Sequence, residues 1–119
     1  MDLQQFILKH IDSVDHLRAL LLLRNEPTRS WGVMEVGARL YLQPRRVSAV
    51  LASLEKAGLV RQDSEENFRF APADQELAQL VEELATLDRE RPVTLIKLIY
   101  SRPNTLEAFA DAFRLRRDD

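Results

Sequence analysis

Apolar residues recur at steps of three and four along most of the chain, which is the spacing of one face of an α-helix. Ser13 and Ser30 each stand just before such a segment, where a serine oxygen can accept a hydrogen bond from a free backbone N–H of the first turn. The pattern predicts helices over residues 2–10, 14–25, 31–40 and 73–91. Helix is therefore the dominant element of the expected fold.

A further helix is predicted over residues 44–57, and both of its ends are marked. Pro44 suits the first helical position, where its missing N–H is not needed, and Gly58 suits the left-handed residue that ends a helix. Its inward face is formed by Val47, Val50, Leu51 and Leu54. Gly37 lies inside the preceding helix, and a glycine there indicates the close approach of another helix.

Apolar and polar residues then alternate in two short runs, residues 59–63 and 67–71, which is typical of strands with one buried face. The residues between them, "SEE", form the turn, and Pro72 ends the second run. The sequence therefore predicts a β-hairpin whose tip is formed by residues 64–67.

Two more apolar segments follow the helix over residues 73–91. Residues 93–100, "VTLIKLIY", are predicted to be helical, with a strand as the alternative because several of them are β-branched. Asn104 and Glu107 have the spacing of a helix N-cap and its reciprocal partner. The residues Leu106, Phe109, Ala110 and Phe113 form an apolar stripe after that cap. A last amphipathic helix is expected there.

Composition narrows the class of protein. At 119 residues with 45% apolar residues, we expect one core and a single domain over residues 1–119. The formal net charge of -2 argues against a surface that is basic all over, although a local basic face is compatible with it. No secretory signal pattern and no apolar stretch of about 20 residues occurs, so we expect a soluble, cytoplasmic protein without a membrane partner.

The chain carries no pattern of a catalytic or metal site. It has no cysteine, which excludes disulfides, thiolate catalysis and cysteine-ligated zinc. His10 and His16 are too far apart to meet on one helix face, and no histidine or carboxylate cluster has metal-ligand spacing. We therefore expect no enzymatic activity, no metal and no cofactor.

The run "MEVGARLYLQPRRVSAVLASLEKAGLVRQD" resembles the winged helix-turn-helix transcriptional regulators of bacteria, such as the MarR-like and PadR-like groups. The residues that carry the resemblance are Val47, Ser48, Leu51, Leu54, Glu55, Gly58, Leu59 and Val60. It covers residues 13–72 and leaves residues 73–119 as a C-terminal helical extension for dimerisation or docking. It implies a mostly α fold with a small β-hairpin, and binding to double-stranded DNA in transcription regulation.

In that family the helix that corresponds to residues 44–57 enters the major groove, and the hairpin lies along the DNA backbone. With the apolar face inward, the outward face centres on Arg45, Ala49, Ala52 and Lys56. Position 49 is often an arginine in these regulators, so the alanine here predicts little direct reading of bases. The candidate DNA contacts are Arg45, Arg46, Ser48, Ser53 and Lys56, with Arg61 and Arg69 in the wing.

An alternative is a winged-helix protein-interaction module that does not read DNA. From residue 44 to 70 five basic residues stand against four acidic ones, and the hairpin tip carries Glu65 and Glu66. A homodimer is expected, since two-fold symmetry would present two recognition helices to one DNA site; a partner protein is the other candidate. The candidate interaction residues are Leu77, Leu80, Leu84, Leu87, Ile96, Tyr100, Phe109 and Phe113. For the four leucines, packing onto the chain's own core is the competing interpretation.

Overall fold

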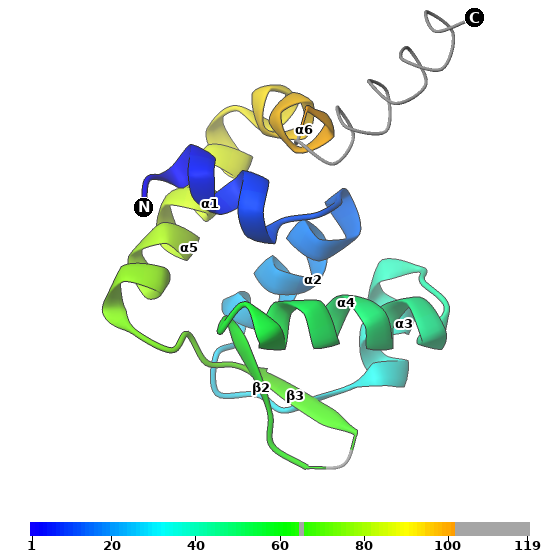
Figure 1. Cartoon of the computed structure of the whole chain (residues 1–119). Helices are drawn as coiled ribbons and strands as arrows, with labels where there is room; N and C mark the ends of the chain where they lie inside the picture. The colour runs from blue at the N-terminus through cyan, green and yellow to red at the C-terminus, as the bar shows by residue number, and fades with distance from the viewer. Residues whose placement is uncertain (65, 102–119) are drawn as a thin grey trace, which may run out of the picture.

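The computed structural model describes residues 1–64 and 66–101, which form helices and three short strands (Figure 1). In chain order these are α1 (Leu3–His10), α2 (Val14–Asn25), β1 (Trp31–Gly32), α3 (Val33–Leu40), α4 (Pro44–Lys56), β2 (Val60–Gln62), β3 (Asn67–Phe70), α5 (Gln75–Glu90) and α6 (Pro92–Tyr100). The fold is mostly helical with one small sheet, as the sequence predicts.

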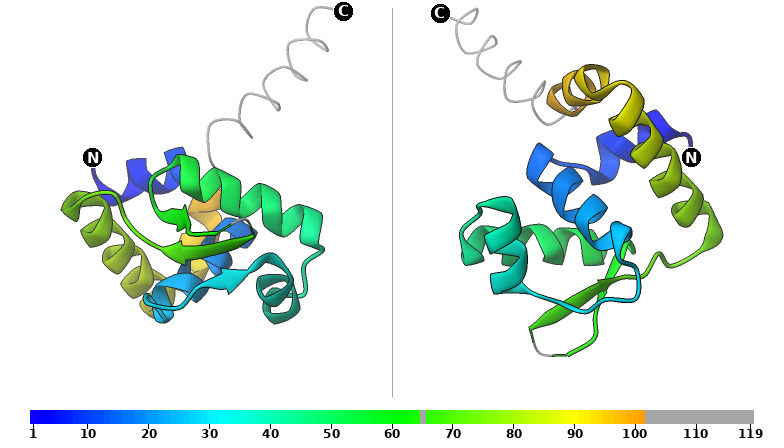
Figure 2. Two further views of the ribbon diagram at one scale, coloured as in Figure 1. Left: turned by 90° about the horizontal axis from the view of Figure 1, so that it is seen from below. Right: turned by 180° about the vertical axis from the view of Figure 1, so that it is seen from behind.

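The strands form one antiparallel sheet in the order β1-β3-β2. β2 and β3 are the predicted hairpin, in which Arg61 lies opposite Arg69 and Gln62 opposite Phe68. β1 pairs with the other edge of β3, so that Trp31 also lies opposite Phe68. Seen from below, the hairpin lies beside α4 (Figure 2, left). A helix, a strand, two helices and a hairpin in this order form a winged helix-turn-helix arrangement, with α3 and α4 as the helix pair and β2–β3 as the wing.

β1 corrects the expectation for residues 31–40. The predicted helix start at Trp31 is wrong, because Trp31 and Gly32 pair with β3 as a strand and the helix begins only at Val33. Gly32 takes the N-cap position, and its N–H donates to Glu35 Oε1 at 3.0 Å. Ser30, the predicted cap, instead donates its hydroxyl proton to Asp63 Oδ1 at 3.0 Å. This bond ties the segment before β1 to the end of β2.

The core surrounds α2, which runs through the middle of the molecule and contacts α3, α4 and β3 (Figure 1). Trp31 of β1 is fully buried in this core. The buried residues of α2 are His16, Leu17, Ala19, Leu20 and Leu23. Those of the predicted inward face of α4 are Val47, Val50, Leu51 and Leu54. Burial of these side chains positions α4 with its opposite face toward solvent.

α1, α5 and α6 form a second group at the other end of the molecule (Figure 2, right). Each of these helices contacts the other two. Residues 93–100 are helical, which decides between the two alternatives left open by the sequence. Leu95 and Ile99, one turn apart on α6, are buried against this group. The last predicted helix, with Asn104, Phe109 and Phe113, lies outside the described residues.

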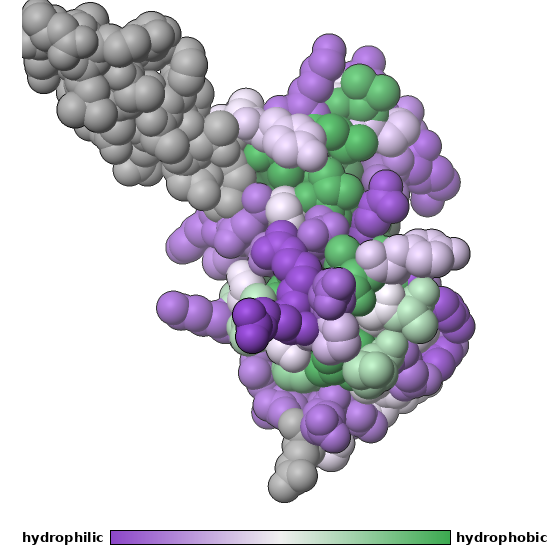
Figure 3. Space-filling view, turned by 90° about the vertical axis from the view of Figure 1, so that its right-hand side faces the viewer, coloured by the Kyte–Doolittle hydropathy of each residue, from purple (hydrophilic) through white to green (hydrophobic). Residues whose placement is uncertain are grey.

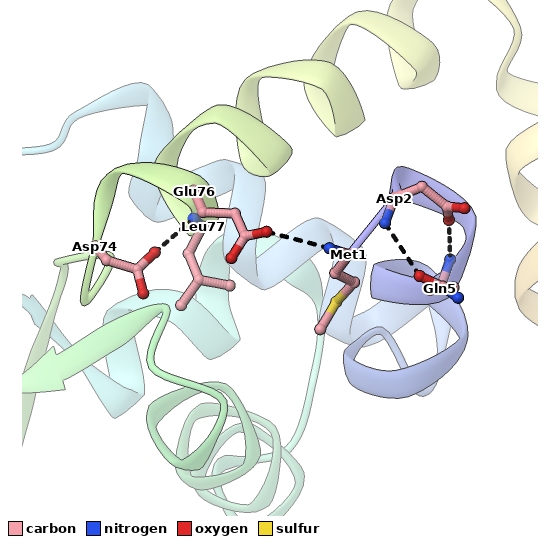
Figure 4. Close-up of polar contacts among 6 residues, drawn as sticks. All are labelled: Met1, Asp2, Gln5, Asp74, Glu76 and Leu77. Carbon is pink, nitrogen blue, oxygen red and sulfur yellow. Dashed lines mark hydrogen bonds and ion pairs between the residues drawn. The ribbon is translucent and has the colours of Figure 1, made fainter.

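The first residues of the chain are tied to the start of α5 (Figure 4). The amino group of Met1 lies 3.1 Å from Glu76 Oε2. Asp2 caps α1 by accepting the Gln5 N–H at 2.8 Å, and the Asp2 N–H donates to the Gln5 side chain in return. These contacts fix the orientation of α1 beside α5, which places the C-terminal end of α1 near α4.

Candidate nucleic-acid interface

The turn between α3 and α4, residues 41–43, sets the angle at which α4 is presented. The Leu42 N–H donates to the Gly37 carbonyl oxygen at 3.0 Å. A Cβ on Gly37 would lie 2.7 Å from the Leu42 oxygen and 3.6 Å from Val47 Cγ2 on α4, so only glycine permits this approach. Tyr41 has a left-handed backbone, with φ 58°, and its side chain is 94% exposed.

Both ends of α4 are formed as the sequence predicts. Pro44 occupies the first turn. At the other end Gly58 has φ 81°, and its N–H donates to the Glu55 oxygen at 2.9 Å. The Leu59 N–H donates to the Leu54 oxygen at 3.0 Å, which completes a Schellman motif. This cap ends the helix and turns the chain directly into the wing.

The outward face of α4 is as predicted from its periodicity. Arg45, Ala49, Ala52 and Lys56 are exposed; of the flanking serines, Ser48 is exposed and Ser53 half-buried. Within residues 1–64 and 66–101, neither Arg45 nor Lys56 has a hydrogen bond or an ion pair. Both cationic groups are therefore open to an anionic ligand, with two small side chains between them.

Arg46, a predicted DNA contact, already has protein partners. Its Nε lies 3.0 Å from Asp15 Oδ2, and its Nη2 donates to Ser13 Oγ at 3.1 Å. Ser13 Oγ also accepts the His16 N–H at 3.3 Å and lies 2.7 Å from His16 Nδ1. Because that hydroxyl accepts two N–H bonds, its own proton is free to go to Nδ1. Arg46 therefore joins α4 to the capped start of α2.

The wing presents two arginines side by side, Arg61 and Arg69. Arg69 Nε lies 3.7 Å from Asp63 Oδ2, which partly neutralises it, whereas Arg61 has no ion pair within the described part of the chain. The Gln62 N–H donates to Glu55 Oε2 at 3.1 Å. That bond runs from the wing to α4, so Glu55 has a structural role in the interface.

The side of the wing that faces the start of α4 carries negative charge. Glu66 lines a hollow of about 430 Å³ together with Met34, Pro44, Ser48 and Gln62. Glu65, the other acidic residue of the predicted tip, lies outside the described residues. A phosphate that approached this hollow would meet the Glu66 carboxylate, and like charges repel.

Lys9 is a cation of this surface that the sequence did not indicate. It lines a hollow of about 270 Å³ with His10, Asp12, Ser53 and Lys56, at the point where the end of α1 meets the end of α4, so the hollow holds one carboxylate beside its two lysines. Partial burial, and then the charge of Lys9, lower the pKa of His10 below its ordinary value, and the Asp12 carboxylate opposes this shift in part. Only the packing of α1 brings Lys9 here; no local pattern could have revealed it.

The predicted interaction residues that the structure describes divide into two groups. Leu80 and Leu84 are buried within the chain, and Leu77 and Leu87 pack against the same core. This agrees with packing onto the chain's own core, because α5 is covered by α1 and α6. Ile96 and Tyr100 on α6 remain exposed, whereas Phe109 and Phe113 lie outside the described residues.

Across residues 1–64 and 66–101, no group of three or more ligating side chains is placed to hold a metal ion. No helix in the same ranges has the length and apolar character required to cross a membrane. The chain matches no protein-family model, and comparison with curated proteins and with solved structures found no match.

Proposed function

We propose that this protein is a DNA-binding transcriptional regulator that places α4 in the major groove and the wing along the backbone. The observation that carries the proposal is the exposed face of α4. Arg45 and Lys56 stand at its two ends with no protein partner among the described residues, and Ala49 and Ala52 lie between them. A face of this kind offers cations to phosphates and close approach to base edges.

The length of α4 suits this role. At a rise of about 1.5 Å per residue, Arg45 and Lys56 lie about 16 Å apart along the helix axis. The major groove is about 12 Å wide, so long side chains at the two ends can reach phosphates on opposite walls. Ala49 and Ala52 can contact thymine methyl groups but cannot form hydrogen bonds to bases. Binding is therefore expected to depend on the backbone more than on sequence.

Two further cations extend the surface on either side of α4. Lys9 adds charge beside Lys56, and Arg61 adds charge on the wing. We assign Arg46 to the support of α4, since Asp15 and Ser13 hold it. Four phosphate contacts, from Lys9, Arg45, Lys56 and Arg61, make up the proposed footprint.

The test uses duplex DNA from the promoter of the protein's own operon. Arg45→Ala and Lys56→Ala should each weaken binding about tenfold, since a charge-assisted bond contributes roughly 1.4 kcal/mol. Arg91→Ala is the matched control, because Arg91 is an exposed arginine at the α5–α6 junction. Equal effects of all three replacements would contradict a role for α4.

The acidic wing favours a second candidate, docking to a basic surface of a partner protein. The observation is Glu66, whose carboxylate lines the hollow beside Ser48. Glu66→Gln separates the two functions: DNA binding should become several-fold tighter as a repulsion is removed, whereas a docked basic partner should be lost. An unchanged or weakened DNA affinity in this variant counts against the first function.

A further inference from the structure

His16, in the first turn of α2, is the one polar residue that is buried within the described part of the chain, with 5% of its surface exposed. Hydrophilic side chains lie mainly at the surface, as on the side of the molecule with α3 and α6 (Figure 3). Burial of an imidazole costs free energy unless its nitrogens form hydrogen bonds inside the protein. The partner of His16 Nδ1 is the hydroxyl of Ser13, at 2.7 Å.

The Ser13 hydroxyl is shared by three groups. Its oxygen accepts the His16 N–H at 3.3 Å and an Nη2 proton of Arg46 at 3.1 Å, and it also lies next to His16 Nδ1. A hydroxyl accepts two hydrogen bonds and donates one. Both N–H groups can only donate, so they occupy the two lone pairs and the hydroxyl proton goes to Nδ1. His16 Nδ1 therefore carries no proton, and the neutral ring carries its proton on Nε2.

Arg46 is held at two points by the start of α2. Its Nε lies 3.0 Å from Asp15 Oδ2, and its Nη2 donates to Ser13 Oγ. Arg46 is the third residue of α4, and its guanidinium group is planar, so two bonds fix the orientation of that group beside the first turn of the helix. Asp15 alone would leave the plane free to turn. The second bond depends on the direction of the Ser13 proton.

We propose that His16 is a positioning residue for DNA binding, which acts through Ser13 and Arg46 to fix the first turn of α4. By accepting the Ser13 proton, the buried ring keeps a lone pair of the hydroxyl turned toward Arg46. Without the ring nitrogen the hydroxyl proton can turn toward the guanidinium group, and the second bond to Arg46 is lost. The inference rests on the proposed function, because α4 carries the proposed contacts with DNA.

Two replacements of His16 separate positioning from packing. His16→Asn keeps an oxygen that can accept the Ser13 proton, but its smaller side chain leaves a void. His16→Leu fills the site with a side chain of similar volume and removes the acceptor. If His16 only fills space, the asparagine variant should be the more impaired. The positioning role predicts that His16→Leu weakens binding of the promoter duplex about fivefold, the equivalent of one hydrogen bond, and His16→Asn less than about twofold.

The same binding assay tests whether the effect passes through Arg46. His16→Leu should cause no further loss of affinity in the Arg46→Ala background. Neither replacement should change the dependence of affinity on salt, because neither residue is a proposed phosphate contact. Additive losses, a changed salt slope, or weaker binding by the asparagine variant than by the leucine variant would each overturn the positioning role.

The ring can also be examined without DNA. Nitrogen NMR of the isotope-labelled full-length chain should show a protonated Nε2 and an unprotonated Nδ1 in His16. Ser13→Ala should shift the Nδ1 resonance, and Ser13→Thr should preserve it because the hydroxyl is retained. A proton on Nδ1 in the wild type contradicts the inference. If the wild type binds no DNA, the proposed function fails as well; if it binds DNA and the two His16 variants bind alike, only the positioning role fails.

Discussion

Tyr41 adopts a left-handed backbone, with φ 58° and ψ 45°, in the turn that joins α3 to α4. This conformation costs a residue with a Cβ about 1–2 kcal/mol, and the exposed ring recovers little of it by packing. Tyr41→Gly removes that cost but adds freedom to the unfolded chain, worth about 0.4–1 kcal/mol. The free energy of unfolding should rise by about 0.5 kcal/mol, measured from the urea midpoint.

The matched control is Tyr100→Gly, in the last turn of α6. That tyrosine is also exposed but has a helical backbone, so glycine should lower stability by about 0.5–1 kcal/mol. A loss of stability in both variants contradicts the conformational cost assigned to Tyr41.

At position 37, in contrast, glycine is required, and its replacement should lower the stability of the fold. A methyl group there would lie 2.7 Å from the Leu42 carbonyl oxygen, and backbone cannot move aside cheaply. Gly37→Ala should therefore lower the free energy of unfolding by about 1–3 kcal/mol and disturb α4. Gly32→Ala is the comparison, because its methyl group would meet the Asn67 side chain at 3.3 Å. Similar unfolding midpoints for the two variants would mean that the α3–α4 turn tolerates the displacement.

Arg45 and Arg46 illustrate the limit of the sequence at this scale. Adjacent residues on a helix point about 100° apart, so Arg45 lies on the outward face of α4 and Arg46 beside it. The sequence therefore leaves both arginines as candidate DNA contacts. Asp15 and Ser13, which hold Arg46, belong to the start of α2. Only the packing of α4 on α2 determines which of the two arginines binds protein partners.

At the scale of elements, local signals were sufficient for α4 and the wing. Pro44 and Gly58 carry the information for both helix ends, and the alternation after Gly58 predicts the hairpin. β1 has no such signal, because Trp31 and Gly32 form a strand only through β3, which is distant in the sequence. Trp31 also lies at helical spacing from the apolar residues of α3, which is why the predicted helix began too early.

The bond between Arg24 of α2 and Glu82 of α5 should stabilise the fold less at acid pH. Arg24 Nε donates to Glu82 Oε2 at 3.1 Å, and this bond lowers the pKa of Glu82 below its ordinary value of 4.5. A carboxyl whose folded pKa is lowered stabilises the fold above its unfolded pKa, and that contribution disappears as the pH falls below about 4.5. Because the pair is exposed and screened, we expect about 0.5 kcal/mol.

Glu82→Gln should remove this contribution at pH 7 and should flatten the decline in stability between about pH 5 and 3. The free energy of unfolding is measured by urea unfolding at each pH. Glu83→Gln is the control, since Glu83 follows on the same helix and has no ion pair among the residues described. A control variant with the same pH profile as Glu82→Gln would show that the Arg24 bond is not the cause.

In the whole molecule, tertiary packing determines which cations share a surface and which apolar faces are covered. The sequence alone does not indicate either. Lys9 joins the basic surface because α1 packs beside α5 and its end reaches α4. The leucines of α5 are covered by α1 and α6, so their helical spacing reflects a core rather than an exposed seam. The exposed apolar residues among those predicted to interact, Ile96 and Tyr100, lie on α6 instead. The sequence of α6 has apolar residues on two faces and does not indicate which of these faces is covered.

The proposed mode of binding makes a quantitative prediction for salt dependence. Four phosphate contacts give a slope of roughly -3 to -4 in a plot of log affinity against log salt concentration, at about -0.9 per contact. The double replacement of Arg45 and Lys56 by alanine should reduce that slope by about 2. The decisive measurement is this titration of wild type and double variant on the same promoter duplex. No binding at low salt, or identical slopes for the two proteins, would contradict DNA binding through α4.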